Sequence, residues 1–117
     1  MVDKFNRILN QIIEEKGNIT IFALLKMDEF VDKWTIVFSA PWSTASTTSA
    51  DFDYIRALVL QELNEEERAT IARIGIFQAN EQLIQLLLQL KTGTVISEDT
   101  KLNGNVLHEG YILASNS

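Results

Sequence analysis

Hydrophobic and polar residues follow one another along this chain in two periods, one helical and one extended. In the first segment, apolar residues recur every three or four positions, at Phe5, Ile8, Leu9, Ile12 and Ile13. This period predicts an amphipathic helix over residues 4–16, with Asp3 placed to cap its start and Gly17 to end it. The apolar stripe of this helix must cover another element of the fold.

Two stretches with a period of two come next. Both faces of residues 18–27 are largely apolar, which is typical of an interior strand covered on both sides. Residues 34–40 alternate in the same way, and the two stretches lie so close in sequence that we expect an antiparallel hairpin. The acidic connection, with Asp28, Glu29 and Asp32, lacks the spacing and the glycine of a calcium loop, so we interpret it as a polar turn.

The second half of the chain alternates between the two periods. Apolar residues predict helices over 51–63 and 81–91, a strand over 70–77, and final strands over 94–97 and 105–114. Asn103-Gly104 lies between the last two strands and is a strong signal for a tight hairpin. Residues 64–68, with the sequence NEEER, are interpreted as the charged end of the helix over 51–63.

The predicted order of elements is therefore α-β-β-α-β-α-β-β. We expect one globular domain over residues 1–117, of the α+β (mixed α/β) class, in which three helices pack on a mixed sheet of about five strands as a layered sandwich. Helical crossovers connect strand 34–40 to 70–77, and strand 70–77 to 94–97, so both connections favour parallel neighbours. The order of the strands in the sheet stays open.

The composition is that of an ordinary folded domain. The chain has 117 residues, of which 46% are hydrophobic and 22% charged, and this is enough apolar material for one core. The chain has no cysteine, which excludes disulfides and thiolate metal sites and is compatible with a reducing compartment. The first residues do not resemble a signal peptide, and no apolar run could span a bilayer, so we expect a cytoplasmic protein.

The charge narrows the range of partners. The net charge is −6, and the ten basic residues are scattered along the sequence with no two adjacent. Nucleic-acid binding needs clustered cations that displace the counterions of the phosphates, so we expect no nucleic-acid partner. Binding to an anionic membrane surface is disfavoured for the same reason.

A loop rich in hydroxyl groups precedes the helix over 51–63. Every residue from 43 to 49 except Ala45 is Ser or Thr. A phosphate cradle is disfavoured because the loop lacks Gly, Lys and Arg, and because Asp51 and Asp53 follow it. We interpret the loop as a solvated connection with a capping box made by Thr48 and Asp51. Contact with a partner, and phosphate binding or phosphorylation, remain as alternatives.

Only weak catalytic candidates are found. His108 is the single histidine, so metal sites built on histidine and Cys–His nucleophile pairs are disfavoured. His108 and Tyr111 could serve an acid–base reaction, but neighbouring strand residues point to opposite faces, so Glu109 is not placed to orient His108. We interpret His108 as structural and assign no cofactor and no metal.

Two functions remain. The first is a non-enzymatic protein–protein interaction or regulatory module that acts as a homodimer or with another protein. Its support is the helix over 81–91, in which Leu86, Leu87 and Leu88 follow one another and nearly close the apolar arc, so that in a two-layer domain one side would meet a partner. We expect Leu86, Leu87 and the aromatic Trp42, which follows Pro41 at a strand end, to form the interface.

The alternative is a small enzyme or ligand-binding domain. Its pocket would lie at the strand ends near His108, with Tyr111, Ser39 and Asp51 as further candidates. A deep cleft in which His108 meets a carboxylate or Tyr111 would favour this alternative. A shallow surface with a broad apolar patch would favour the interaction module.

Overall fold

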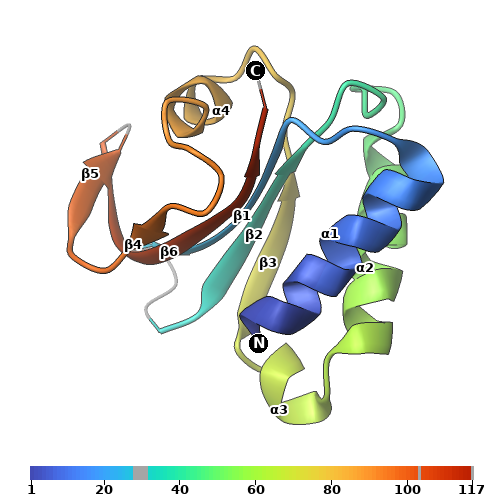
Figure 1. Cartoon of the computed structure of the whole chain (residues 1–117), viewed down its shortest axis with the longest axis horizontal. Coiled ribbons are helices and arrows are strands. Elements are labelled where there is room, and N and C mark those ends of the chain that lie inside the picture. Colours follow the sequence, from blue (N-terminus) through green and yellow to red (C-terminus); the bar gives the residue numbers. More distant parts are fainter. Residues whose placement is uncertain (28–31, 103, 117) are drawn as a thin grey trace.

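The segments with the helical period form helices, and the segments with the extended period form the strands of one mixed sheet. The helices lie on both sides of this sheet (Figure 1). A computed structural model describes residues 1–27, 32–102 and 104–116. Their elements are α1 (Val2–Lys16), β1 (Ile21–Met27), β2 (Trp34–Ser39), α2 (Thr48–Glu62), α3 (Glu65–Arg68), β3 (Ile71–Ile76), α4 (Gln82–Leu87), β4 (Val95–Ile96), β5 (Thr100–Leu102) and β6 (Asn105–Ser115). The predicted class, a mixed sheet layered with helices, is confirmed.

The sheet has the order β3-β2-β1-β6-β4, and β5 pairs with β6 beside this path. The predicted hairpin of β1 and β2 is confirmed, with Ile21 opposite Ser39 and Lys26 opposite Trp34. On its other side β1 pairs with β6, also antiparallel. Of the acidic connection between β1 and β2, Asp28 and Glu29 lie outside the described residues.

One of the two predicted parallel crossovers is confirmed. β2 and β3 are parallel neighbours, and α2 with α3 connects them. The second prediction is wrong, because β4 pairs antiparallel with β6 at the far end of the sheet instead of joining β3. The chain crosses the other face of the sheet through α4, and this path leaves β3 as an outer strand.

The predicted hairpin near the C-terminus forms with a different first strand. Leu102 of β5 pairs with Asn105 of β6, and Gly104 between them has a φ of 77°, which suits glycine. The prediction missed β5, and the strand expected over 94–97 is reduced to the two residues of β4. Asn103 lies outside the described residues.

A hydrophobic core lies on each face of the sheet. On the α1 and α2 face, the buried rings of Phe5, Phe22 and Phe38 pack in a row, with centroid distances of 6.2 and 6.1 Å. On the opposite face, Ile84 and Leu87 of α4 pack on the other side of β1 and β2. The prediction that residues 18–27 form a strand covered on both sides is therefore confirmed for β1.

We call the core on the α1 and α2 face the first core and the core on the opposite face the second core. The second core contains leucines of α4 and of the turn that follows it. α4 ends at Leu87, well before the predicted end at residue 91, and Leu88 and Leu90 pack half-buried from the turn that follows it. Helices thus cover both faces of the sheet, and the expectation of a two-layer domain is wrong (Figure 1). Most apolar side chains of residues 83–90 therefore pack against the sheet of the same chain.

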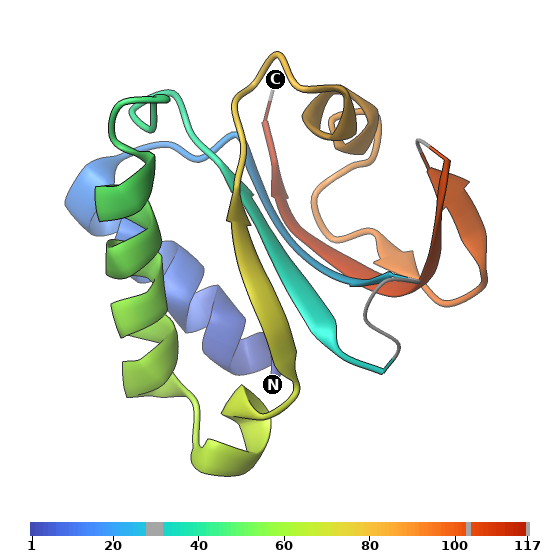
Figure 2. The ribbon, with the colours of Figure 1, turned by 180° about the vertical axis from the view of Figure 1, so that it is seen from behind.

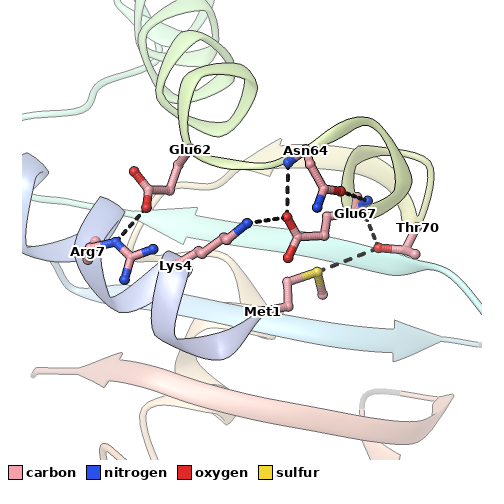
Figure 3. A network of polar contacts seen from close by, with 7 residues as sticks. All are labelled: Met1, Lys4, Arg7, Glu62, Asn64, Glu67 and Thr70. Atoms are coloured by element: carbon pink, nitrogen blue, oxygen red, sulfur yellow. Dashed lines mark hydrogen bonds and ion pairs between the residues drawn. The ribbon is translucent and has the colours of Figure 1, made fainter.

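Charged side chains connect α1 to the corner between α2 and α3 (Figure 3). The NEEER segment is a separate turn of helix, α3, in which Asn64 and Glu67 form a capping box. Glu67 also accepts a hydrogen bond from Lys4 at 2.6 Å, and Arg7 pairs with Glu62. The bond from Lys4 and the backbone amide of Asn64 hold the pKa of the Glu67 carboxyl below its ordinary value.

Candidate functional site

The hydroxyl loop is folded around a carboxylate of its own. Asp51 is 8% exposed, and its Oδ2 accepts hydrogen bonds of 2.7 Å from both Ser43 and Thr47. The predicted capping box is wrong, because Thr47 occupies the cap position and Thr48 donates to the carbonyl of Thr44 instead. A bound phosphate would meet the Asp51 carboxylate, so this geometry does not favour an anion site.

Trp42 holds the same loop against the first core. Its ring is half-buried and lies 5.5 Å from the ring of Phe38, and its Nε1 donates to the carbonyl of Asn18 at 3.0 Å. The partly exposed ring leaves an interface role for Trp42 as a prediction.

The two leucines expected at an interface lie in different surroundings. Leu87 is fully buried among the residues of the second core, where the chain itself occupies its surface. Leu86 is half-buried, so only Leu86 of this pair offers surface to a partner. Its role in an interface stays a prediction.

His108 meets a carboxylate, but at an open surface. Its Nδ1 lies 2.9 Å from Oδ1 of Asp99, and the two side chains are 37% and 72% exposed. Tyr111 packs instead against Trp34, with ring centroids 5.6 Å apart, and lines a crevice beside Gly93 that does not include His108. The two catalytic candidates therefore do not share a closed cleft.

A crevice lies beyond the carboxyl ends of β2 and β3, at the opposite end of the sheet from His108. It has a volume of about 590 Å³ and is lined by Asn18, Ile19, Thr20, Pro41, Ala79, Gln85, Leu88 and Asn116. None of these residues is charged, and none was proposed from the sequence.

The polar side chains of this crevice are used to hold its walls together. The amide of Gln85 donates to the carbonyl of Ala79, and that of Asn116 donates to the carbonyl of Ile19. Ser39 is fully buried at the end of β2, and its hydroxyl has no hydrogen-bond partner among the described residues. The crevice does not include His108, where the pocket was expected, and it lacks the charged groups that acid–base chemistry needs.

Within residues 1–27, 32–102 and 104–116, no group of three or more His, Cys, Asp or Glu side chains lies close enough together to hold a metal ion. Over the same residues, every helix is too short or too polar to cross a bilayer.

A groove lies beside the outermost strand of the sheet, between β3 and α2. Figure 2 shows the ribbons of these two elements. It has a volume of about 210 Å³, and we call it the edge groove. Its lining residues are Phe52, Arg56, Val59 and Leu60 of α2, Arg68 of α3, and Ile71, Ala72, Arg73 and Ile74 of β3. Leu60 is 38% exposed, and the isoleucines of β3 are half-buried, so the groove presents apolar surface to solvent.

Among the described residues, no strand pairs with β3 on the side away from β2, so its backbone is open there. The amide of Phe77 donates to the carbonyl of Phe38 at 2.8 Å and thus points toward β2. Because amide directions alternate along a strand, the amide of Gly75 also points toward β2, and those of Ile74 and Ile76 point away from it. Amides that point outward at a sheet edge can pair with another chain.

The edge groove also gathers cations on an acidic protein. Arg56, Arg68 and Arg73 are three of the four arginines of the chain, and no Asp or Glu is among the lining residues. Within the described part of the chain, Arg56 and Arg68 form no ion pair, whereas Lys4 and Arg7 are each paired with a glutamate.

The sequence interpretation missed this site because the three arginines are far apart in the chain. A signal was present in Arg73, a cation in the middle of an otherwise apolar strand. Such a residue is typical of an outer strand, where charge opposes uncontrolled pairing.

Comparison of the chain with models of known protein families finds no match, and comparisons with curated proteins and with solved structures find no match either.

Proposed function

We propose that the protein is a non-enzymatic interaction module that binds an extended segment of a partner protein along β3. The observation that carries the proposal is the open edge of β3 directly beside the apolar edge groove. In strand addition, main-chain hydrogen bonds to an exposed edge supply affinity, and pockets for alternate side chains supply specificity. β3 and the edge groove offer both kinds of contact.

The position of the apolar residues supports this mode of binding. Ile71 and Ile74 of β3 face α2 across the edge groove, together with Val59 and Leu60. A segment paired with β3 would direct every second side chain toward this apolar floor, because strand side chains alternate between faces. Burial of those side chains would add to the affinity by about 25 cal/mol per Å² of apolar surface.

We propose the homodimer separately, with Leu86 of α4 as its remaining support. Leu87, Leu88 and Leu90 pack in the second core, so the half-buried Leu86 is the leucine of these four that can contact a partner. We also propose a cytoplasmic location, for which the cysteine-free composition is the remaining support.

The test of the proposed function is a displayed library of random twelve-residue peptides, followed by amide hydrogen exchange of the protein with a selected peptide. We expect exchange at Ile74 and Ile76 to slow on binding, while Gly75, already bonded to β2, changes little. Selected peptides that leave the Ile74 and Ile76 amides unchanged, or a library without any enrichment, would overturn the proposal.

A pair of variants provides an independent check. Ile76→Pro removes an outward amide and places a ring on the open edge, while the bond from Phe77 to β2 remains. Ile76→Val is the matched control, because it keeps the amide. Peptide binding should be lost in Ile76→Pro and retained in Ile76→Val, and equal binding by both variants would contradict strand addition.

A further inference from the structure

The cations around the edge groove point to the chemistry of its occupant. The lining contains Arg56 on the helical wall, Arg68 at the end where β3 begins, and Arg73 within β3. The chain as a whole carries a net charge of −6, so this concentration of positive charge is a local exception. Guanidinium groups bind carboxylates through directional, often bidentate hydrogen bonds.

We infer that the occupant is an acidic extended segment of a partner protein, with Asp or Glu side chains among its apolar residues. This inference rests on the proposed function, because it assigns the chemistry of a segment that pairs with β3. Arg56 and Arg68 are exposed and form no ion pair among the described residues, so carboxylates of a partner can reach them without breaking an existing pair.

A second copy of this chain is a poorer occupant. Pairing of β3 with itself across a two-fold axis would bring the same surface together twice. The arginines of one edge groove would then face those of the other, and like charges opposite one another destabilise paired strands. The charge of the site thus favours a partner that differs from the chain itself.

Nucleic acid would also bring negative charge, but the shape of the site disfavours it. The edge groove is an apolar floor with cations at its margins, whereas phosphate backbones are bound by a continuous basic stripe. The remainder of the chain is acidic and would repel a long polyanion. A short acidic strand with apolar residues matches both the floor and its margins.

The test uses three synthetic nine-residue peptides that alternate Val with Glu, Gln or Lys, and a ten-residue oligothymidylate, all below the onset of self-assembly. Isothermal titration gives the affinities, and amide exchange at Ile74 and Ile76 reports strand addition. We expect the Glu peptide to bind most tightly and the Lys peptide least. Equal affinity of the Glu and Gln peptides, or tighter binding of the oligonucleotide than of the Glu peptide, would overturn the inference.

Substitution of the arginines locates the effect. In the double variant Arg56→Gln, Arg68→Gln, we expect the Glu peptide to bind about 2- to 30-fold more weakly, the range for two partly exposed ion pairs. The double variant Lys91→Gln, Lys101→Gln makes the same change of charge away from the edge groove and should leave the affinity unchanged. An equal loss in both variants would mean that net charge, not the edge groove, selects the peptide, and would overturn the inference.

The two proposals fail in different ways. Protection of Ile74 and Ile76 by all three peptides with equal affinity would leave strand addition standing and remove the preference for acidic segments. Binding of the Glu peptide that depends on Arg56 and Arg68 without protection of those amides would overturn strand addition alone. Protection of the same amides in the absence of any peptide, together with a dimeric mass, would identify a second copy as the occupant and overturn the inference.

Discussion

At one edge of the sheet, β3 runs for six residues beside β2 with a largely apolar sequence, IARIGI. At the other edge, β4 has only two residues, and β5 branches from β6 a few residues further along the chain. The connection between β4 and β5 carries the exposed Glu98 and Asp99, and β5 itself carries the exposed Lys101. One edge is continuous and apolar, and the other is short, interrupted and charged.

Short strands and charged side chains are the usual means by which proteins prevent sheets from joining edge to edge. The chain applies both to the β4 and β5 edge, whereas at β3 Arg73 is the only charged residue of the strand. The difference between the two edges supports the proposal that β3 binds a partner. This difference is the reason for placing the interaction surface at β3.

The largest predicted effect is a difference in stability loss between two glycine-to-alanine substitutions, one near each edge of the sheet. A Cβ at Gly110 would lie 3.0 Å from Leu25 Cδ2 and 3.3 Å from Ile96 Cδ1, both of which are buried. We expect Gly110→Ala to lower the free energy of unfolding by about 1–3 kcal/mol, as in other overpacked cores. Urea denaturation measures the change.

Gly75 in β3 is the comparison. The three atoms nearest to its Cβ would belong to the ring of Phe77, with Cε2 at 2.6 Å, and this half-buried ring is the far end of a side chain that can turn away. Alanine also loses less backbone entropy than glycine in a strand, which offsets part of the cost. Gly75→Ala should therefore cost less than about 1 kcal/mol, and a larger loss than that of Gly110→Ala would show that the ring of Phe77 is held rigidly.

A smaller difference in stability is expected between two aliphatic residues, one on each edge strand. Ile74 is half-buried and packs against the first core, whereas Val95 of β4 is 58% exposed. We expect Ile74→Ala to cost about 1–2 kcal/mol, less than the roughly 2–5 kcal/mol of a fully buried isoleucine, because Ile74 is half-buried. Val95→Ala should stay within about 0.5 kcal/mol, as for most surface substitutions. Equal losses in thermal or urea unfolding would contradict the difference in packing between the edges.

A further prediction concerns the surface through which copies of the chain would associate, which is either α4 with Leu86 or the edge strand β3. If copies associate through α4, Leu86→Glu should give a monomer, while Ile76→Lys on β3 should leave the mass of the dimer unchanged. Sedimentation of both variants at about 100 μM, above the micromolar range of weak specific complexes, decides between the surfaces. A monomeric mass for the wild-type chain at that concentration would remove the homodimer.

The smallest effect concerns the contact that connects α1 to the corner before β3 (Figure 3). The pKa of Glu67 is lowered in the folded chain, chiefly by the bond from Lys4. Its contribution to stability is therefore complete above the ordinary pKa of the carboxyl and is lost as the pH falls through the lowered value. Glu67→Gln should flatten the dependence of stability on pH in this acidic range, and an unchanged profile would mean that the contact contributes nothing measurable.

Much of the fold could be predicted because its elements have clear periods. The apolar stripe of α1 and the doubly apolar β1 follow directly from residue spacing, and β1 is indeed covered on both faces. β5 was not predictable in this way, because the sequence SEDTKL has too few apolar residues to show alternation. The pairing with β6 forms this strand, and pairing between segments is not encoded in a local period.

The candidate site was harder to predict because it depends on strand order. The sequence drew attention to polar residues with known chemistry, such as His108, but the structure places His108 at an open surface. Arg56, Arg68 and Arg73 come together only because β3 lies at the edge of the sheet beside α2. A sequence period identifies which residues share a face of one element, but it does not tell which element has no neighbour.

The pairing of β1 with β6 has a consequence for how the chain reaches its native state. Ile21 pairs with Ser115, and these residues are separated by almost the full length of the chain. Contacts between such distant residues slow folding, because a large loop must close before the contact is gained. During synthesis β1 can pair early with β2, but its other side must wait until β6 has left the ribosome. In that interval β1, which is apolar on both faces, has an unpaired edge, so newly made chains should depend on chaperones more than the finished fold does.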